Sequence, residues 1–163
     1  MEPQSSPSDL ELLVFELAGI RYALKLEAVR EVTRAVLITP LPDAPPVIEG
    51  VVEVRGELVP VYDLRLRFGH EARPLDPEER LVIAWTGSRL AAFRCDTTGW
   101  VESISRDRVG SPAALRAAGR HIAGVARLSD GLVLIQDLER FLDEAEATRL
   151  GSALSARAAR EAE

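Results

Sequence analysis

The sequence predicts a mainly β protein built as two small barrels, with short capping helices and one helix at the C-terminal end. Two observations lead to this prediction. Roughly ten short apolar segments are separated by turn residues at close spacing, which is typical of β-sandwiches and barrels. One strand–turn–strand–helix unit also occurs twice in the chain, and two related barrels explain such a repeat better than a single sheet does.

The unit that defines the repeat spans residues 47–69, with the sequence VIEGVVEVRGELVPVYDLRLRFG. Apolar and polar residues alternate along its first strand, and Gly56 marks the turn. Pro60 lacks an N–H donor, which favours an edge or bulge position for the second strand. Asp63 is placed to cap a short helix by accepting hydrogen bonds from its first turn, and Gly69 ends that helix.

The same pattern returns 74 residues later without a gap, so that residues 47–64 align with residues 121–138. Seven pairs of residues are identical in this register: Ile48 and Ile122, Gly50 and Gly124, Val51 and Val125, Leu58 and Leu132, Val59 and Val133, Asp63 and Asp137, Leu64 and Leu138. Because these identities fall at turn, cap and core positions, they argue for two copies of one supersecondary unit.

Apolar runs and turn residues predict the remaining elements. The other predicted strands are residues 12–17, 20–26, 34–38, 81–85, 90–93 and 100–104. The other predicted helical segments are a turn at residues 27–32, a short helix at 111–119 and a closing helix at 138–145. Residues 39–46 contain four prolines and predict a stiff connecting loop.

Composition suggests where the folded part begins and ends. Residues 1–10 are polar and acidic and are expected to form a disordered arm rather than a secretory signal. Residues 71–79 are polar with two prolines, so the boundary between the two barrels is expected near residues 70–80. Residues 147–163 are rich in alanine and arginine and are expected to form a fraying helical tail.

Charge and hydropathy weigh against several classes of partner. The net charge is −6 and the basic residues are scattered, which weighs against nucleic acid and anionic membranes. No apolar run approaches the roughly 18 residues that a membrane helix requires, so direct membrane insertion is not expected. Cys95 is the single cysteine, which excludes an internal disulfide and a cysteine-based metal cluster and fits a reducing cytoplasm.

The sequence contains no familiar catalytic pattern. It has no phosphate-binding glycine loop, no histidine pair at helical spacing and no Gly-x-Ser-x-Gly elbow, so no enzyme activity, metal or cofactor is predicted. A small β-barrel enzyme that uses Cys95 or His121 stays open as an alternative, although Asp96 would raise the pKa of the adjacent thiol. Arg55, on the same strand face as Glu53, fits either a structural ion pair or a partner contact.

The segment GVVEVRGELVPVYDL, preceded by the proline-rich loop and followed by Phe68-Gly69, resembles the signature of the CheW-like domain. The similarity extends through residues 12–22, Cys95-Asp96, Gly124 and residues 137–142, and covers residues 11–146. It implies two five-stranded SH3-like barrels with a C-terminal helix. It also implies a non-enzymatic chemotaxis adaptor that couples chemoreceptors, the methyl-accepting proteins, to the regulatory domain of a CheA-type histidine kinase in two-component signal transduction.

The resemblance further implies a cytoplasmic protein recruited to membrane-associated receptor arrays, with the receptor's helical tip bound in a groove between the barrels. The positions that match the family's receptor-binding residues are Val29, Glu31, Gly50, Arg55, Leu81 and Val101. Glu53 joins them as a candidate because it shares a strand face with Arg55; the family usually has asparagine at this position. The same fold in a non-flagellar array, such as one for pilus motility, is the alternative pathway.

Overall fold

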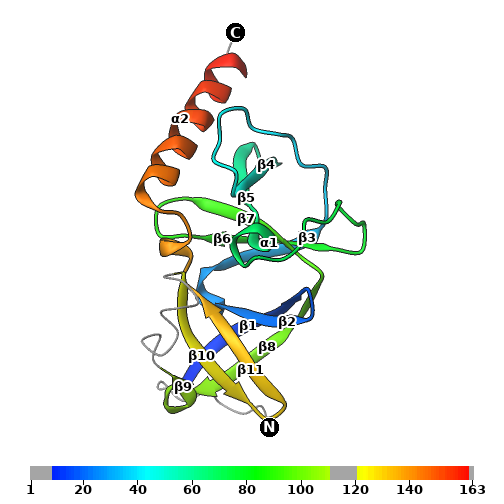
Figure 1. Ribbon diagram of the computed structural model, residues 1–163, viewed down its shortest axis with the longest axis vertical. Coiled ribbons are helices and arrows are strands. Elements are labelled where there is room, and N and C mark those ends of the chain that lie inside the picture. The colour runs from blue at the N-terminus through cyan, green and yellow to red at the C-terminus, as the bar shows by residue number, and fades with distance from the viewer. Residues whose placement is uncertain (1–8, 111–120, 162–163) are drawn as a thin grey trace.

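The computed structural model describes residues 9–110 and 121–161. Its strands form two sheets, stacked along the long axis of the molecule in Figure 1. Sheet A contains β1 (Asp9–Leu17), β2 (Ile20–Lys25), β8 (Thr97–Ser105), β9 (Val109–Gly110), β10 (Ile122–Leu128) and β11 (Gly131–Gln136). Sheet B contains β3 (Val29–Arg34), β4 (Ile48–Val54), β5 (Glu57–Tyr62), β6 (Arg80–Trp85) and β7 (Leu90–Cys95). The predicted mainly β class is confirmed.

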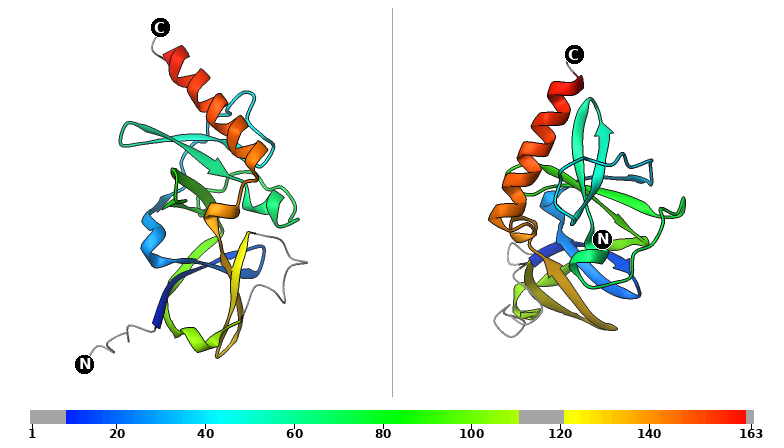
Figure 2. Two further views of the ribbon diagram at one scale, coloured as in Figure 1. Left: turned by 90° about the vertical axis from the view of Figure 1, so that its left-hand side faces the viewer. Right: turned by 45° about the horizontal axis from the view of Figure 1, so that its top comes forward.

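The helical elements are short except at the C-terminal end. They are the 3-10 helices η1 (Leu26–Ala28), η2 (Arg106–Arg108) and η4 (Leu138–Arg140) and the α-helices α1 (Leu64–Arg67) and α2 (Glu144–Glu161). Helix α2 runs past sheet B, away from sheet A (Figures 1 and 2). Within the described residues, no helix is long and apolar enough to cross a membrane.

The sequence repeat has a counterpart in the strand pairing. Sheet B has the order β3-β6-β7-β5-β4, and sheet A has the matching order β8-β1-β2-β11-β10, with β9 added at its edge. In each copy the hairpin joins its sheet through a parallel pair, β5 with β7 and β11 with β2. A bulge follows Ile48 in one hairpin and Ile122 in the other. The two units therefore share one topology.

The apolar residues form three groups. The interior of sheet A holds Leu12, Val14, Ala23, Ile104, Ala126, Val133 and Ile135. The interior of sheet B holds Val52, Val59, Val61, Leu81, Ile83 and Ala92. A larger shared core joins residues of both sheets, among them Leu13, Phe15 and Leu24 from sheet A and Val82 and Phe93 from sheet B. The shared core makes the two barrels one folded body.

Two helix caps follow the sequence prediction. The side chain of Asp63 accepts a hydrogen bond from the Leu66 N–H at 3.0 Å, and that of Asp137 accepts one from the Glu139 N–H at 3.1 Å. Since an aspartate at this position satisfies an N–H that the helix leaves free, each cap fixes the exit of its hairpin.

The division of the chain differs from the prediction. The boundary expected near residues 70–80 is wrong, because β6 and β7 follow this segment but belong to sheet B, while the N-terminal hairpin β1–β2 belongs to sheet A. The barrels are thus interlaced along the chain. Residues 1–8 of the expected arm lie outside the described residues, and β1 already begins at Asp9.

Several predicted elements also differ. The helical turn expected at residues 27–32 is only η1, because β3 starts at Val29 and pairs with β6. The strand expected at residues 34–38 does not form, because β3 ends at Arg34 and residues 35–38 lie outside any strand; Thr39 makes an isolated bridge to Val51. The short helix expected at residues 111–119 lies outside the described residues.

The C-terminal helix is a structural part of the fold. In place of the closing helix predicted at residues 138–145, η4 is followed by α2, which continues to Glu161. Asp143 and Glu146 form a reciprocal cap, with Glu146 N–H to Asp143 Oδ1 at 2.7 Å and Asp143 N–H to Glu146 Oε1 at 2.9 Å. Leu150 is fully buried in the shared core, so α2 is anchored and is not merely a tail.

A buried charge network holds the segment before β6 against sheet B. The Arg94 guanidinium donates to both carboxylate oxygens of Glu79, at 2.7 and 2.9 Å, and to Glu49 Oε1 at 2.6 Å. It also donates to the carbonyl oxygens of Arg73 and Pro74. Burial opposes the charge on Arg94, but the hydrogen bonds and the charges of Glu79 and Glu49 raise its pKa above the ordinary value.

Candidate protein-binding surfaces

One candidate surface lies where the edge strands of the two sheets run beside the shared core. β3 is one edge of sheet B, and β8 is one edge of sheet A. Val32 pairs with buried Val82, and Val101 pairs with buried Leu13, so both valines lie on faces that belong to the shared core. Val32 is 41% exposed and Val101 53% exposed. We call this surface the β3/β8 edge.

Val29 and Glu31 continue the β3/β8 edge along β3. Val29 is half-buried and packs against the shared core, and a bulge separates it from Glu31 in the pairing with β6. A bulge in β8 lies at the corresponding place, where β1 passes from Val14 to Phe15. Bulges re-aim side chains at sheet edges, which places the Glu31 carboxylate near the turn that follows β4.

Arg55 occupies that turn. Its φ is 49° and that of Gly56 is 84°, so both central residues have the left-handed conformation of a tight hairpin turn. The Arg55 side chain is 85% exposed, and its Nη2 lies 3.1 Å from Glu31 Oε2. Positive φ is unusual for arginine, and such strain is common at functional sites.

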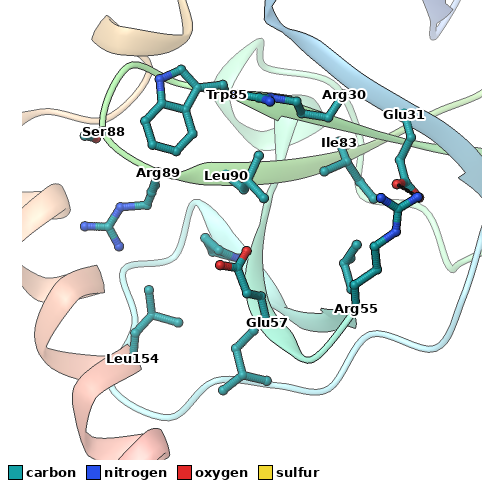
Figure 3. A pocket seen from close by; sticks show the side chains of 13 residues that line it. Arg30, Glu31, Arg55, Glu57, Ile83, Trp85, Ser88, Arg89, Leu90 and Leu154 are labelled. Carbon is teal, nitrogen blue, oxygen red and sulfur yellow. Dashed lines mark ion pairs between the residues drawn. The ribbon is translucent and has the colours of Figure 1, made fainter.

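A pocket of about 720 Å³ opens beside this ion pair (Figure 3). We call it the Arg55–Trp85 pocket; its lining includes Arg30, Glu31, Arg55, Trp85, Arg89 and Leu154. The Arg30 guanidinium carbon lies 5.9 Å from the centre of the Trp85 ring, within the range of a cation–π contact. Trp85 is 41% exposed. Three arginines and an exposed indole give this pocket the composition of a protein-binding hot spot.

Two of the residues predicted at the receptor site are buried. Leu81 is 1% exposed in the interior of sheet B, because it precedes Val82 by one residue and so points to the opposite face of β6. Gly50 is also buried, and a Cβ there would collide with the Thr39 carbonyl oxygen. Leu81 and Gly50 therefore lie beneath the surface and cannot contact a partner directly.

The other predicted residues are half-buried or exposed, and they lie on both sheets. Glu53 is exposed on β4, opposite Leu58, and within the described residues its carboxylate makes no hydrogen bond or ion pair. Of the two alternatives for Arg55, an ion pair is present, but its partner is Glu31 and not Glu53, because Arg55 leaves the strand at the turn. Val101 lies on sheet A, whereas Glu31 and Arg55 lie on sheet B.

Sequence reasoning did not single out Val32, Trp85 and Arg30, which the structure places at these candidate surfaces. The prediction of a helical turn at residues 27–32 hid the alternation of exposed and half-buried residues along β3. A bulky aromatic residue directly before the Thr86-Gly87-Ser88 turn is a signal that could have indicated Trp85, since a strand end beside a turn is usually accessible.

Cys95 and His121, the two residues that the enzyme hypothesis would use, are buried. Cys95 is fully buried, and burial together with the charge of Asp96 raises the pKa of its thiol to about 12. A thiol with such a pKa is a poor nucleophile at neutral pH. His121 is 7% exposed and lies against the rings of Phe68 and Phe141, at 5.1 and 6.3 Å between centres.

Comparisons with known proteins agree with this architecture. A protein-family model, the CheW-like domain, matches residues 11–146. Protein FrzA of Myxococcus xanthus is 40% identical over 122 residues, which cover 73% of this chain and 75% of the relative. Chemotaxis protein CheW of Klebsiella aerogenes is 26% identical over 139 residues, which cover 83% of each chain.

A solved structure shows the same fold. The crystal structure of scaffolding protein TtCheW from Thermoanaerobacter tengcongensis superimposes with a TM-score of 0.77 at 28% identity, covering 84% of this chain and 94% of that one. The two interlaced barrels, the repeated hairpin and the match over residues 11–146 establish that the chain belongs to the CheW-like domain family.

Proposed function

We propose that this chain is a chemotaxis adaptor, a scaffold that couples chemoreceptors to a CheA-type histidine kinase. The observation that carries the proposal is the CheW-like domain match, which spans residues 11–146 and so includes both barrels. The likeness to a solved scaffolding protein at a TM-score of 0.77 supports it. The adaptor acts by binding and has no enzyme activity of its own, a role that fits the burial of Cys95 and His121.

The receptor's helical tip is proposed to bind at the β3/β8 edge. Val29, Val32 and Val101 supply apolar side chains from both sheets, since Val32 and Val101 stay exposed on strand faces that belong to the shared core. Glu31 and Arg55 supply charges from sheet B, and an ion pair exposed on one side is free to exchange partners with a receptor side chain. Gly50 and Leu81 hold the strands beneath.

The proposed setting is the cytoplasm, at membrane-associated receptor arrays, with the regulatory domain of the kinase as second partner. The chain's net charge of −6 supports protein partners over nucleic acid. Use of the same adaptor in a different, non-flagellar array is the second candidate. It is favoured by the 40% identity to Protein FrzA, a relative whose name is distinct from that of chemotaxis protein CheW.

Reconstitution tests the adaptor proposal. The purified chain is added to a CheA-type kinase and a receptor fragment, and kinase autophosphorylation is measured with each component omitted in turn. Stimulation is expected only when all three are present. ATP hydrolysis or phosphate acceptance by the chain alone would contradict an adaptor role. Co-purification from the native cell, with identification of the receptor and kinase, separates the two candidate pathways.

An alkylation control addresses the enzymatic alternative directly. Because Cys95 is fully buried and its thiol pKa is raised to about 12, iodoacetamide should not label the native chain at pH 8, while it should label the unfolded chain rapidly. Mass spectrometry measures the labelled fraction. Rapid labelling of the native chain with loss of an esterase activity would support the enzyme instead.

A further inference from the structure

The Arg55–Trp85 pocket combines an apolar lining with a set of charged side chains (Figure 3). The apolar lining residues are Val54, Leu58, Pro60, Ile83, Leu90 and Leu154. Ile83 belongs to the interior of sheet B, and Val54 and Leu90 pack against that interior, so the pocket opens over its end. Leu154 comes from α2, which borders the pocket on one side.

The charged side chains of the pocket include an excess of arginine. Arg30, Arg55 and Arg89 line it together with Glu31 and Glu57. The ion pair between Arg55 and Glu31 neutralises one charge of each sign. Within the part of the chain that the structure describes, Arg30, Arg89 and Glu57 make no ion pair, so two guanidinium groups remain against one carboxylate. The pocket is therefore locally positive on a chain whose net charge is −6.

Trp85 holds the Arg30 guanidinium in place and leaves its donors accessible. Arg30 is exposed, and its guanidinium carbon lies over the half-exposed Trp85 ring at 5.9 Å from the ring centre. A guanidinium over an aromatic ring keeps the N–H donors in its own plane free. These donors match the two oxygens of a carboxylate, which they can bind through parallel hydrogen bonds. Arg30 is thus positioned in advance for an anionic group.

The second copy of the fold shows that the strand itself does not require an arginine here. Arg30 is the extra residue of the bulge in β3 and has no pairing partner in β6. The corresponding strand of sheet A, β8, has a bulge at the same place in its pairing, and the extra residue there is Gly99. Because that bulge forms without a side chain, the fold does not account for the arginine. Bulges re-aim side chains, and this one directs Arg30 to the pocket.

We propose that the Arg55–Trp85 pocket binds an acidic segment of a protein partner. One carboxylate of the segment binds Arg30, Arg89 attracts a second, and an apolar side chain between them packs on the exposed face of Trp85. Charge complementarity selects such a partner, because the pocket is positive on a negative chain.

Glu57 favours a peptide over a nucleic acid as the occupant. Its carboxylate is exposed and lines the pocket. A nucleic acid carries a negative charge at every phosphate and would bring several of them close to this carboxylate. A peptide can place an uncharged residue opposite Glu57 and keep its own carboxylates for the arginines.

Nuclear magnetic resonance tests the proposal with an acetylated and amidated Glu-Leu-Glu tripeptide as the probe. Titration should shift the indole N–H signal of Trp85 and leave that of Trp100 in place, because Trp100 lies on sheet A. The Gln-Leu-Gln peptide should bind at least threefold more weakly, which isolates the contribution of the carboxylates. Inorganic phosphate and single-stranded oligothymidylate should each bind more weakly than the probe. Because the probe is an isolated peptide, the result does not depend on the proposed adaptor function.

Charge-neutralising variants locate the binding site. Arg30→Gln and Arg89→Gln should each weaken binding of the probe at least threefold. Arg34→Gln is the matched control, because Arg34 is exposed on the same strand as Arg30 but does not line the pocket, and its affinity should be unchanged. Glu57→Gln should strengthen binding at least twofold, since it removes a carboxylate that repels the probe.

Thermal unfolding of each variant controls for loss of the fold. Arg30 and Glu57 are exposed, so their variants should keep the thermal midpoint of the parent chain. If Arg30→Gln lowers the midpoint, Glu57→Gln carries the test, because partial unfolding cannot strengthen binding. Equal binding of Gln-Leu-Gln, equal affinities of Arg30→Gln and Arg34→Gln, or weaker binding by Glu57→Gln would each overturn the proposal. Phosphate binding as tight as that of the probe, or no detectable binding of the probe, would overturn it as well.

Discussion

Arg55 and Glu31 join the two edge strands of sheet B through one ion pair. Glu31 lies on β3, and Arg55 directly follows β4, at the opposite edge of the sheet order. The Arg55 side chain is 85% exposed and the Glu31 side chain 32% exposed, and Arg55 Nη2 lies 3.1 Å from Glu31 Oε2. An exposed ion pair contributes only about 0–1 kcal/mol to folding, so we expect this pair to matter more for partner binding than for stability.

Arg55→Ala is therefore expected to fold normally and to lose receptor affinity. The free energy of unfolding should change by less than about 1 kcal/mol. An arginine central to an interface contributes on the order of 2 kcal/mol of binding, so affinity for the receptor tip should fall roughly 30-fold. Calorimetric titrations against the receptor tip and the kinase regulatory domain measure both partners. Equal losses for the two partners would indicate a structural role for Arg55.

Glu53 should act independently of Arg55. The two side chains are not paired, so Glu53→Asn and Arg55→Ala should have additive effects on receptor affinity, within about 0.5 kcal/mol, in a double-mutant cycle. Glu53→Asn restores the usual family residue and should change which receptors bind, with the kinase affinity unchanged. Glu31→Gln provides the matched comparison, because it removes the partner of Arg55 and should be non-additive with Arg55→Ala. Additive behaviour of that second pair would contradict the observed ion pair.

Val32 and Val101 should contribute to the same interface from different sheets. Val→Thr preserves β-branching and shape but adds a hydroxyl, so each single variant should keep its fold and weaken receptor binding a few-fold through the cost of burying that group. The double variant should lose about tenfold, or about 1.4 kcal/mol. Leu37→Thr in the connecting loop, where the side chain is 84% exposed, is the control. A loss in the control as large as in the double variant would exclude a specific contact.

Local signals made the repeat and its caps predictable. Gly56, Asp63 and Asp137 act through neighbours only a few residues away, so their roles can be inferred from sequence and are found in the structure. Long-range pairing could not be inferred. The pairing of β1 with β8 joins segments far apart in the chain, and so does the ion pair between Arg55 and Glu31. The strand register could not be inferred either. Leu81 and Val82 are consecutive residues and point to opposite faces of β6, and only Val82 lies on the same face as its pairing partner Val32.

The two caps should contribute similarly to stability. Asp63→Ala and Asp137→Ala each remove the acceptor of one hydrogen bond at a helix start, which should lower the free energy of unfolding by about 1 kcal/mol. Asp→Ser at the same positions keeps an acceptor and should recover most of the loss. Chemical denaturation of the four variants gives the comparison. Unchanged stability with lost kinase coupling would mean that these carboxylates contact a partner.

The chain should lose stability at alkaline pH because of its two tyrosines. Burial raises the pKa of Tyr22 and of Tyr62 to about 12, from an ordinary value of 10. The folded state therefore holds these protons where the unfolded state releases them, so this contribution is complete below pH 10 and is lost as the pH rises toward 12. Tyrosinate absorbance followed together with circular dichroism should show ionisation coupled to unfolding. Ionisation near pH 10 with the fold intact would contradict the burial of both hydroxyls.

Arg94 should be the most sensitive charged residue in the fold. Its guanidinium is the partner of Glu79, which is 2% exposed, and Arg94→Ala would leave that carboxylate buried without its main partner. Breaking a buried pair in this way typically costs about 3–5 kcal/mol. Arg73→Ala is the control, because Arg73 is 45% exposed and lies 3.9 Å from the same carboxylate; its loss should cost less than about 1 kcal/mol.

The double variant Arg94→Leu/Glu79→Leu decides between a charge effect and a packing effect. Removing both charges eliminates the stranded carboxylate, so part of the stability lost in Arg94→Ala should return. Glu49 still loses its hydrogen bond from Arg94 at 2.6 Å, which keeps the recovery incomplete. Urea denaturation measures each free energy of unfolding. If the double variant is no more stable than Arg94→Ala, the guanidinium acts mainly through the carbonyl oxygens of Arg73 and Pro74 and not through Glu79.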